Sequence, residues 1–286
     1  MQTLQAGFIA ISFTLWTLAL LPFQFLGLRL RRFGFGRWLV ETVPQVYFRG
    51  NAWLLRLEIV RLGQVSTARP TLFVANHVSW IDIVAFNAAV KASFIAKYEV
   101  AGYPLLGWLA RLQRTVFIER KRRRTAKHSD EMTARLQAGD SLILFPEGTS
   151  SDGMRLLEFK SAFFVLAERP IGASPLTVQP ISIAYRRLAH LPIGRRWMPV
   201  VAWIGDEDLL SHLWHYLGHT PAEVVLQFHP PVTIQDFASR KELAAHCRRV
   251  IARGVSDVHS GRQSAPTEKP VGDAGRIDRS AMPPAA

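Results

Sequence analysis

A histidine and an aspartate five residues apart, His77 and Asp82, are the residues of this sequence best suited to acid-base chemistry. They follow the apolar run 71–75, which is short, is preceded by Pro70 and is typical of a buried strand. In an α/β sheet, groups just beyond the carboxyl end of a strand lie where ligands bind. An imidazole titrates near neutral pH, and a carboxylate can fix its tautomer. The pair is therefore suited to removing a proton from a hydroxyl group.

The spacing of the two residues restricts where they can meet. On one ideal helix, positions five apart point about 140° away from each other. His77 must therefore lie in the turn before a helix and Asp82 in its first turn, and Ser79 as the N-cap residue would give this arrangement. A simpler interpretation uses the same residues: Ser79 and Asp82 only cap the helix, and His77 is a loop residue.

Two more strand-like runs end in polar residues. The run 141–145 leads into 146–153, which contains two acids, two glycines and three hydroxyl groups. Glycines let backbone amides approach a ligand closely. The run 115–118 leads into Glu119 and Arg120, and arginine can hold a phosphate or carboxylate through two hydrogen bonds. We expect the three strand ends to converge on one crevice.

These residues resemble the motifs of the lysophospholipid acyltransferases, the group that contains 1-acylglycerol-3-phosphate acyltransferase. The family has an Asn-His pair followed by Asp, a Phe-Ile-acid-Arg strand end, a Phe-Pro-Glu-Gly-Thr motif and a strand with a central proline. The matching residues are Asn76, His77 and Asp82, then 117–120, then 145–149, and then 178–181. The order and spacing of the four motifs agree from about Leu72 to Ala184.

The resemblance implies transfer of a fatty acyl group from acyl carrier protein or acyl-CoA to the free hydroxyl of a lysolipid. His77 would be the general base and Asp82 its orienting partner. The residues expected to bind substrate are Asn76, Ser79, Arg120, Glu147, Gly148 and Thr149. Because the oxyanion of such a transfer requires only nearby hydrogen-bond donors, we expect no metal and no cofactor.

Two positions depart from the residues that are usual in the family. Arg114 stands where a glycine is usual, and Ser150 stands where an arginine is common. We expect both near the head-group site, which disfavours a plain glycerol-phosphate acceptor. The runs 113–118, 149–153 and 202–206 resemble the subgroup that acylates lyso-ornithine lipid and so makes ornithine lipid. The alternatives are a 1-acylglycerol-3-phosphate acyltransferase, which makes phosphatidic acid, and a non-catalytic membrane lipid-binding protein.

The alternation of strand and helix patterns predicts an α/β fold, with a three-layer, mostly parallel sheet flanked by helices. Strands are predicted at 57–62, 71–75, 93–96, 115–118, 141–145, 178–184, 200–204 and 224–229. Helices are predicted at 80–90, 104–112, 125–137, 159–168 and 239–256. The last helix opens with a capping box formed by Ser239 and Glu242.

The first 28 residues contain no charged side chain. The run 7–28 is long enough to cross the hydrocarbon core of a membrane as a helix of roughly 20 residues, although Pro22 could limit it to one leaflet. The arginines that follow, Arg29, Arg31, Arg32 and Arg37, favour the cytoplasmic side of the cell inner membrane for the rest of the chain. A cleaved signal peptide is the alternative, but there is no basic segment before the apolar run and no clear cleavage site.

The sequence thus divides into four parts. They are an N-terminal membrane anchor at 1–32, an amphipathic membrane-proximal segment at 33–62, an acyltransferase domain at 63–258 and a disordered tail at 259–286. The tail is rich in proline, glycine and serine and poor in large apolar residues. The segment 33–62 could instead be an ordinary core-facing helix followed by a strand, because periodicity alone does not separate the two.

The net charge of +13, from 35 Lys and Arg against 22 Asp and Glu, favours anionic partners. The basic run 120–124 fits anionic membrane lipids or an acidic acyl carrier protein, or it is merely a solvated helix start. Nucleic acid is not expected, because no aromatic residues are interleaved with the run and no binding module is present. Cys247 is the only cysteine, so the chain can form no internal disulfide.

Three histidines, His212, His215 and His219, would share one face of a helix. Imidazoles can bind a metal, but no carboxylate completes the set and Trp214 nearby favours a segment at the membrane interface. The sequence also lacks a serine-hydrolase elbow, a P-loop and a dinucleotide fingerprint. The histidine-aspartate pair therefore remains the candidate for catalysis.

Overall fold

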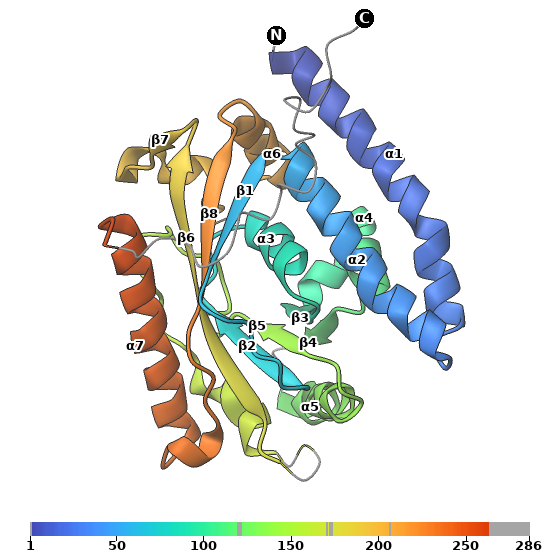
Figure 1. Cartoon of the computed structure of the whole chain (residues 1–286), viewed down its shortest axis with the longest axis vertical. Coiled ribbons are helices and arrows are strands. Elements are labelled where there is room, and N and C mark those ends of the chain that lie inside the picture. The colour runs from blue at the N-terminus through green and yellow to red at the C-terminus, as the bar shows by residue number, and fades with distance from the viewer. Residues whose placement is uncertain (1, 119–121, 170, 172–173, 206, 263–286) are drawn as a thin grey trace, which may run out of the picture.

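The computed structural model describes residues 2–118, 122–169, 171, 174–205 and 207–262 (Figure 1). Its strands are β1 (Leu57–Leu62), β2 (Thr71–Ala75), β3 (Ser93–Lys97), β4 (Val116–Ile118), β5 (Leu142–Leu144), β6 (Thr177–Leu188), β7 (Leu191–Pro192) and β8 (Ala222–Phe228). In the described part they form one eight-stranded sheet in the order β1-β8-β6-β2-β5-β3-β4, with β7 beside β6. The pairs from β6 to β4 are parallel, whereas β8 runs antiparallel to β6. The predicted α/β fold with a mostly parallel sheet is confirmed.

The helices cover both faces of this sheet. The α-helices are α1 (Gln2–Arg29), α2 (Gly34–Leu54), α3 (Ile81–Ala89), α4 (Pro104–Leu112), α5 (Arg122–Gln137), α6 (Leu209–Leu217) and α7 (Arg240–His259). The 3-10 helices are η1 (Tyr98–Gly102), η2 (Ser161–Glu168), η3 (Arg195–Val200) and η4 (Ile234–Asp236). Helix α7 lies on one face, while α3 and then α2 lie on the other (Figure 1).

Two apolar layers hold the helices to the sheet, and β2 contributes to both. Phe73 and Ala75 belong to the core that contains α3, whereas Leu72 and Val74 belong to the core that contains α7. Successive side chains of a strand point to opposite faces. A strand covered on both faces is therefore apolar throughout, which is why 71–75 is an uninterrupted apolar run.

Several predicted elements have the predicted bounds, and others differ for physical reasons. The strands 57–62 and 71–75 and the helix 104–112 are confirmed. The predicted strand 200–204 is wrong, because η3 occupies Arg195–Val200 and a turn follows it. Val200 and Val201 are buried in the core beside α3, and the amide of Trp203 donates to the carbonyl oxygen of Val78 (3.0 Å). This apolar run is a loop packed into the core.

Two further helix predictions need correction. The predicted helix 159–168 is the 3-10 helix η2. At the start of α7, the Ser239 hydroxyl accepts from the amide of Glu242 (3.3 Å) as expected. The Glu242 carboxylate, however, accepts from the amide of Ala238 (3.3 Å), so only half of the predicted capping box forms.

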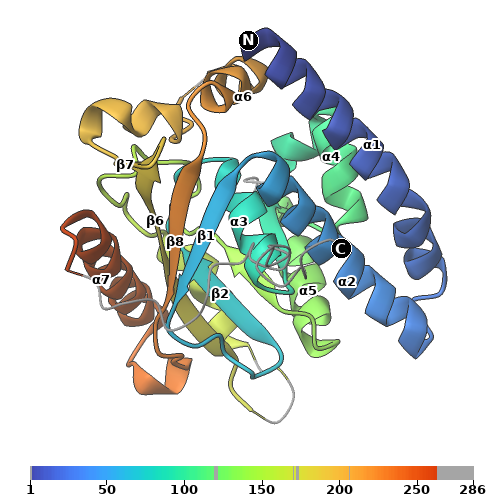
Figure 2. The same cartoon turned by 45° about the horizontal axis from the view of Figure 1, so that its top comes forward.

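The membrane-anchor segment forms a helical hairpin with the helix that follows it. Helix α1 packs along α2, and its amino end contacts α6 (Figure 2). Within the described residues, α1 is the one helix long and apolar enough to cross a membrane, and only 11% of its most apolar window is buried. Pro22 lies inside α1 without ending it. The predicted tail lies outside the described residues from 263 onward, while His259 still belongs to α7.

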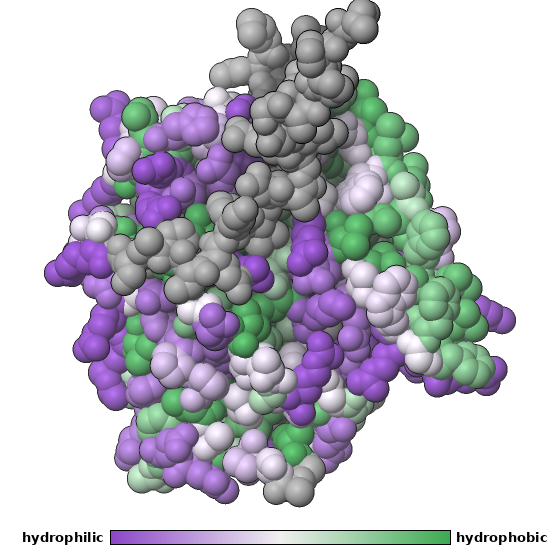
Figure 3. All heavy atoms as spheres, in the orientation of Figure 1, coloured by the Kyte–Doolittle hydropathy of each residue, from purple (hydrophilic) through white to green (hydrophobic). Residues whose placement is uncertain are grey.

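Helices α1 and α4 expose large apolar side chains. On α1 these include Phe8, Ile11, Leu15, Leu18 and Phe23, and α4 adds Leu105, Leu106 and Trp108. Figure 3 shows apolar residues gathered along the edge of the molecule where α1 lies. An exposed apolar surface of this kind marks contact with a membrane or a protein.

Candidate active site

The loops that follow β2 and β5 meet because the two strands are parallel neighbours in the sheet. The amide of His77 donates to Glu147 Oε1 (3.3 Å). In return, the amide and the hydroxyl of Ser151 both donate to the carbonyl oxygen of His77 (2.8 and 3.0 Å). The predicted convergence of these two strand ends is therefore present. Arg120, expected at the third strand end, lies outside the described residues.

The Asp82 carboxylate is the centre of the site and is fully buried. Its Oδ2 atom accepts from His77 Nδ1 (2.9 Å) and from the amides of Val78 (2.6 Å) and Ser79 (2.9 Å). Its Oδ1 atom accepts from the hydroxyl of Tyr185 (2.7 Å). A buried charge requires such partners, and four donors supply them here. Because a carboxylate only accepts hydrogen bonds, His77 carries its proton on Nδ1.

The imidazole of His77 is held in one orientation. Its ring stacks on Phe145, with centroids 4.2 Å apart and planes 13° apart, and the bond to Asp82 fixes its rotation. The His77 side chain is 18% exposed. With the proton on Nδ1, Nε2 has a free lone pair and no hydrogen-bond partner among the residues that the structure describes. This nitrogen is suited to act as a general base.

Ser79 does not cap the helix, so that prediction is wrong. Helix α3 begins at Ile81, its N-cap residue is Trp80, and no side chain caps it. The hydroxyl of Ser79 is buried and has no hydrogen-bond partner among the described residues. Asp82 instead reaches back to the free amides before the helix, which satisfies them from within the first turn. The interpretation of His77 as a plain loop residue is also wrong, because it is bonded to Asp82.

Asn76 fixes the end of β2 to β6. Its Nδ2 donates to the carbonyl oxygen of Ile183 (2.9 Å), and its Oδ1 accepts from the amide of Ile183 (2.8 Å). The side chain is 1% exposed. Both polar atoms bind the backbone of Ile183, and the substrate-binding role expected for Asn76 stays a prediction. The residue orients the segment that carries His77.

Tyr185 is the residue of this site that the sequence analysis missed. Burial, together with the charge of Asp82, raises the pKa of Tyr185 well above its usual value, so the hydroxyl remains a donor. Tyr185 lies on β6, five residues after Pro180 of the fourth motif, and faces the same core as Ile181 and Ile183. Residues 181, 183 and 185 alternate along β6 and therefore point to the same face of the sheet. This alternation was the sequence signal that could have placed Tyr185 on the α3 side.

Glu147 supports the backbone of the site and is not a free anion. It is 2% exposed, and its two oxygens accept from the amides of His77 and Leu157. Burial raises the pKa of Glu147 to about 8, against the opposing effect of these two amides. The side chain is therefore mostly protonated at neutral pH.

The next two predicted substrate-binding residues follow Glu147 on the same loop. Gly148 has φ +70°, a backbone conformation that favours glycine, and Thr149 is exposed. A Cβ atom at Gly148 would lie 3.0 Å from Lys160 Nζ. Lys160 thus brings a cation to this loop that the sequence analysis did not single out.

The two positions that depart from the family pattern lie at opposite ends of the sheet. The hydroxyl of Ser150 donates to the carbonyl oxygen of Trp203, close to the segment that carries His77. Arg114 precedes β4 and pairs with Asp140 (2.7 Å), so its expected place near the head-group site is wrong. A residue that precedes a parallel strand lies at the amino edge of the sheet. The backbone φ of Arg114 is +64°, a conformation that favours glycine, which explains why a glycine suits this position.

The histidines of α6 do not form a metal site. His212 is buried, its Nδ1 accepts from Trp80 Nε1 (3.0 Å), and its Nε2 donates to the carbonyl oxygen of Ala202 (3.1 Å). Both ring nitrogens are therefore occupied. No group of three or more His, Cys, Asp or Glu residues suited to a metal occurs in the described ranges.

Comparisons with known proteins agree with this geometry. The Acyltransferase family model matches residues 56–184. The chain is 40% identical over 246 residues to a lyso-ornithine lipid O-acyltransferase of Brucella abortus, covering 85% of this chain and 90% of that protein. It is 38% identical over 230 residues to the protein of that name from Rhizobium meliloti, covering 79% and 77%. Among solved structures, the 1-acyl-sn-glycerophosphate (LPA) acyltransferase PlsC of Thermotoga maritima superposes with a TM-score of 0.67 at 25% identity, covering 93% of this chain and all of that one.

Proposed function

The chain belongs to the acyltransferase family, and we propose that it acylates the free hydroxyl of lyso-ornithine lipid to give ornithine lipid. The observation that carries this proposal is the free Nε2 of His77, which the bond to Asp82 (2.9 Å) and the stacking on Phe145 hold in place. Support for the acceptor comes from the relatives that cover most of the chain, which are named for this reaction.

The reaction follows from the tautomer of His77. Nε2 removes the proton from the acceptor hydroxyl as its oxygen attacks the thioester carbonyl carbon. The imidazolium that forms keeps its Nδ1 hydrogen bond to Asp82, whose negative charge stabilises it. When the C–S bond breaks, His77 returns the proton to the leaving thiolate. The products are an ester and a free thiol, and His77 is again neutral.

The loop that carries Glu147, Gly148 and Thr149 is proposed to bind the polar head of the acceptor. Thr149 is exposed, and the Lys160 amine lies beside Gly148. A cation and exposed hydroxyl are suited to the carboxylate of an ornithine head group. The acyl donor is proposed to be acyl carrier protein or acyl-CoA. Both are anionic, which fits the net charge of +13.

The enzyme is proposed to act at the cytoplasmic face of the inner membrane. The exposed apolar side chains of α1 and α4 would enter the lipid. Because α1 lies along α2 and its amino end contacts α6, we favour a hairpin embedded in one leaflet over a helix that crosses the bilayer. The four arginines between Arg29 and Arg37 would lie among the head groups.

The catalytic part of the proposal is tested by His77→Ala. Loss of the general base is expected to reduce acyl transfer by roughly 10²- to 10⁴-fold. Circular dichroism and vesicle binding should remain unchanged. His215→Ala, which removes an exposed histidine on α6, is the matched control and should keep full activity. Full activity of His77→Ala, or wild-type protein that binds lipid without turnover, would contradict the assignment.

The acceptor is tested by supplying purified protein with a labelled acyl donor and either lyso-ornithine lipid or 1-acylglycerol 3-phosphate. We expect a clear preference for lyso-ornithine lipid. The rival acceptor is favoured by the structural relative, whose name refers to 1-acyl-sn-glycerophosphate, although at 25% identity. Transfer to 1-acylglycerol 3-phosphate alone would show that the acceptor is wrong while leaving the reaction class intact.

A further inference from the structure

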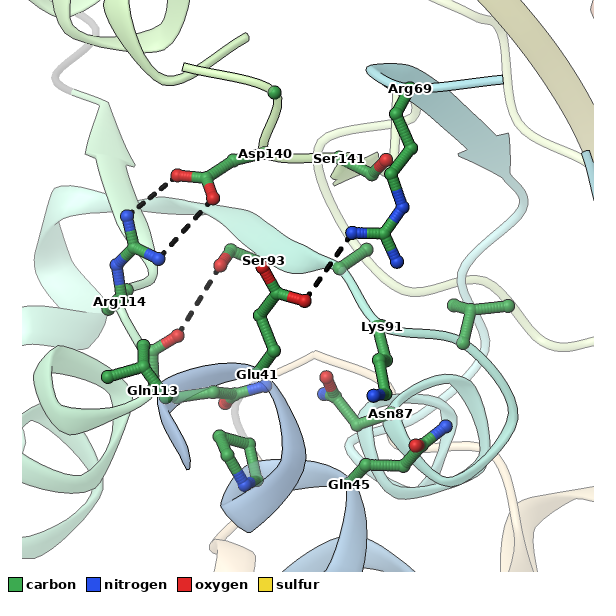
Figure 4. A pocket seen from close by; sticks show the side chains of 15 residues that line it. Glu41, Gln45, Arg69, Asn87, Lys91, Ser93, Gln113, Arg114, Asp140 and Ser141 are labelled. Carbon is green, nitrogen blue, oxygen red and sulfur yellow. Dashed lines mark hydrogen bonds and ion pairs between the residues drawn. The ribbon is translucent and has the colours of Figure 1, made fainter. Parts of the chain in front are cut away.

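A second polar site lies at the opposite end of the sheet from His77. Here a cavity of about 490 Å³, including space open to solvent, lies between α2 and the segments that precede β2, β3, β4 and β5 (Figure 4). We call it the amino-edge pocket. Its polar lining consists of Glu41, Gln45, Arg69, Asn87, Lys91, Ser93, Gln113, Arg114, Asp140 and Ser141. None of these residues takes part in the site around Asp82.

Positive charge exceeds negative charge around this pocket. Glu41 accepts from Arg37 (3.3 Å) and from Arg69 (3.4 Å). Asp140 is likewise shared between two arginines, Arg114 (2.7 Å) and Arg135 (2.6 Å).

One more cation of the pocket lacks a carboxylate. Lys91 is exposed, and among the described residues its Nζ donates only to the hydroxyl of Thr42 at 3.4 Å. Four arginines thus share two carboxylates in this part of the described chain, and Lys91 adds a fifth cation. Such an excess attracts an anion.

The pocket also contains a donor with no acceptor. Gln113 Nε2 is buried and has no hydrogen-bond partner among the described residues. Buried polar atoms are generally paired. Gln113, Lys91 and the exposed Arg69 line the same pocket, and each carries a donor suited to an anion.

The position of the pocket indicates where that anion comes from. Helix α2 forms one wall and packs along the exposed apolar helix α1. The turn between the two helices is also close, since Arg31 interacts electrostatically with Arg114. In a membrane-embedded hairpin, this turn and the pocket lie at the level of the lipid head groups, where phosphates are the abundant anions.

We propose that the amino-edge pocket binds the phosphate of an anionic phospholipid head group, at a site separate from the one that holds the acyl acceptor. The bound phosphate would join α2 to the sheet edge through Lys91, Arg69 and Gln113. This proposal rests on the membrane association proposed above and does not depend on the identity of the acceptor.

The test measures binding of the full chain to vesicles of phosphatidylcholine, with and without phosphatidylglycerol. The double variant Arg69→Gln/Lys91→Gln should bind the phosphatidylglycerol vesicles about tenfold more weakly or worse. Binding to pure phosphatidylcholine, which depends on the apolar hairpin, should not change. The matched control Lys241→Gln/Arg253→Gln removes two exposed cations of α7, on the other face of the sheet. An equal loss of vesicle binding in the control would show that surface cations anywhere on the protein contribute alike. It would contradict specific binding in the amino-edge pocket.

Gln113→Leu tests the pocket without changing any charge. A loss of about threefold or more is expected on phosphatidylglycerol vesicles, in line with one hydrogen bond to a charged group. No loss would mean that the orphan amide does not touch the ligand, and the proposed geometry would be wrong. His77→Ala should bind as wild type does, so failure of the catalytic proposal remains distinguishable from failure of this one.

Two further measurements distinguish the phospholipid from two other possible ligands of the pocket, free phosphate and acyl carrier protein. If inorganic phosphate stabilises the lipid-free protein and displaces phosphatidylglycerol vesicles at millimolar concentration, the pocket binds free phosphate and the lipid source is wrong. If Arg69→Gln/Lys91→Gln loses binding to acyl carrier protein but keeps binding to phosphatidylglycerol, the pocket is a carrier-protein contact. Either result would overturn the proposal.

Discussion

The two ends of the sheet handle buried charge in opposite ways. Around Asp82, one carboxylate accepts four hydrogen bonds of 2.6–2.9 Å and no part of it is exposed. Around the amino-edge pocket, the two carboxylates are each shared by two arginines, and the Glu41 and Asp140 side chains remain 25% and 11% exposed. At the first end every donor is required, whereas at the second end water or another cation can replace a lost partner. We therefore expect substitutions at the Asp82 end to have large effects on acyl transfer and substitutions at the other end to have small ones.

Asp82→Asn should have the largest effect. The new NH2 group replaces one accepting oxygen: at Oδ2 it opposes three donors and no longer selects the Nδ1 tautomer of His77, and at Oδ1 it opposes the Tyr185 hydroxyl. Transfer is expected to fall by roughly 10³- to 10⁴-fold, and the loss of a buried charge partner should lower the free energy of unfolding by about 3 kcal/mol. Kinetics and chemical denaturation measure the two effects. For Asp130→Asn, an exposed carboxylate paired with Arg169, changes below about 1 kcal/mol are expected.

Tyr185→Phe removes one of the four donors and should have the next largest effect. A hydrogen bond to a charged group contributes about 1.5–3 kcal/mol, so a fall in kcat of about tenfold is expected, with KM little changed. Tyr216→Phe is the matched control, because its hydroxyl is also buried and donates to the carbonyl oxygen of Leu55 (3.1 Å). That variant should lose about 1 kcal/mol of stability and keep its kcat. Equal losses of kcat in both variants would show that Tyr185 has only a structural role.

Glu147→Gln should change how stability depends on pH. The folded protein holds the Glu147 proton up to about pH 8, whereas the unfolded chain releases it near pH 4.5. The stability that this proton contributes is therefore complete below pH 4.5 and is lost as the pH rises through 8. Between pH 4.5 and pH 8, the free energy of unfolding of Glu147→Gln should rise relative to that of wild type by at most roughly 1.4 kcal/mol per pH unit.

Thermal unfolding of wild type and variant from pH 5 to pH 8 measures this difference directly. Comparing the two proteins cancels the contributions of other groups, such as His229, whose pKa burial lowers to about 4. The exposed Glu131 provides a control, since Glu131→Gln should leave the pH dependence unchanged. A constant offset between wild type and Glu147→Gln at all pH values would contradict the raised pKa.

Glu41→Gln should have the smallest effect. Its two arginines are 55% and 53% exposed, so water replaces the lost carboxylate. A loss of about 0.5–1 kcal/mol is expected, and it should diminish as salt is added. Denaturation at low and high salt measures it. A loss as large as that of Asp82→Asn would remove the contrast between the two ends of the sheet.

The sequence predicted the contact between His77 and Asp82 because the two residues lie close together, directly after a recognisable strand. Tyr185 lies 103 residues beyond Asp82, so its contact follows from the pairing of β2 with β6 and not from any local spacing. Ser79 was misassigned because serine usually caps its own helix. Here the Asp82 carboxylate instead reaches back to the amides of Val78 and Ser79 and to the imidazole of His77.

The remaining wrong predictions inferred the place of a residue from its neighbours in the sequence. Arg114 lies close in the sequence to the Phe-Ile-acid-Arg motif, yet it precedes β4 and so lies at the amino edge of the sheet, opposite the edge where His77 lies. The apolar run 200–204 has the composition of a strand. The preceding Pro199 has no backbone N–H, and the Trp203 amide bonds to the segment before α3, so no neighbouring strand is paired there. Tertiary contacts of this kind are not encoded in a local pattern.

The α1–α2 hairpin has a consequence for how this protein is inserted after synthesis. In the one-leaflet hairpin proposed above, α1 doubles back along α2 and its amino end rests on α6, so the start of the chain and the sheet would share one compartment. With that topology no charged segment would have to be translocated, and insertion would need no protein-conducting channel. A reporter enzyme fused ahead of α1 would thus be active on the same side as one fused after α7.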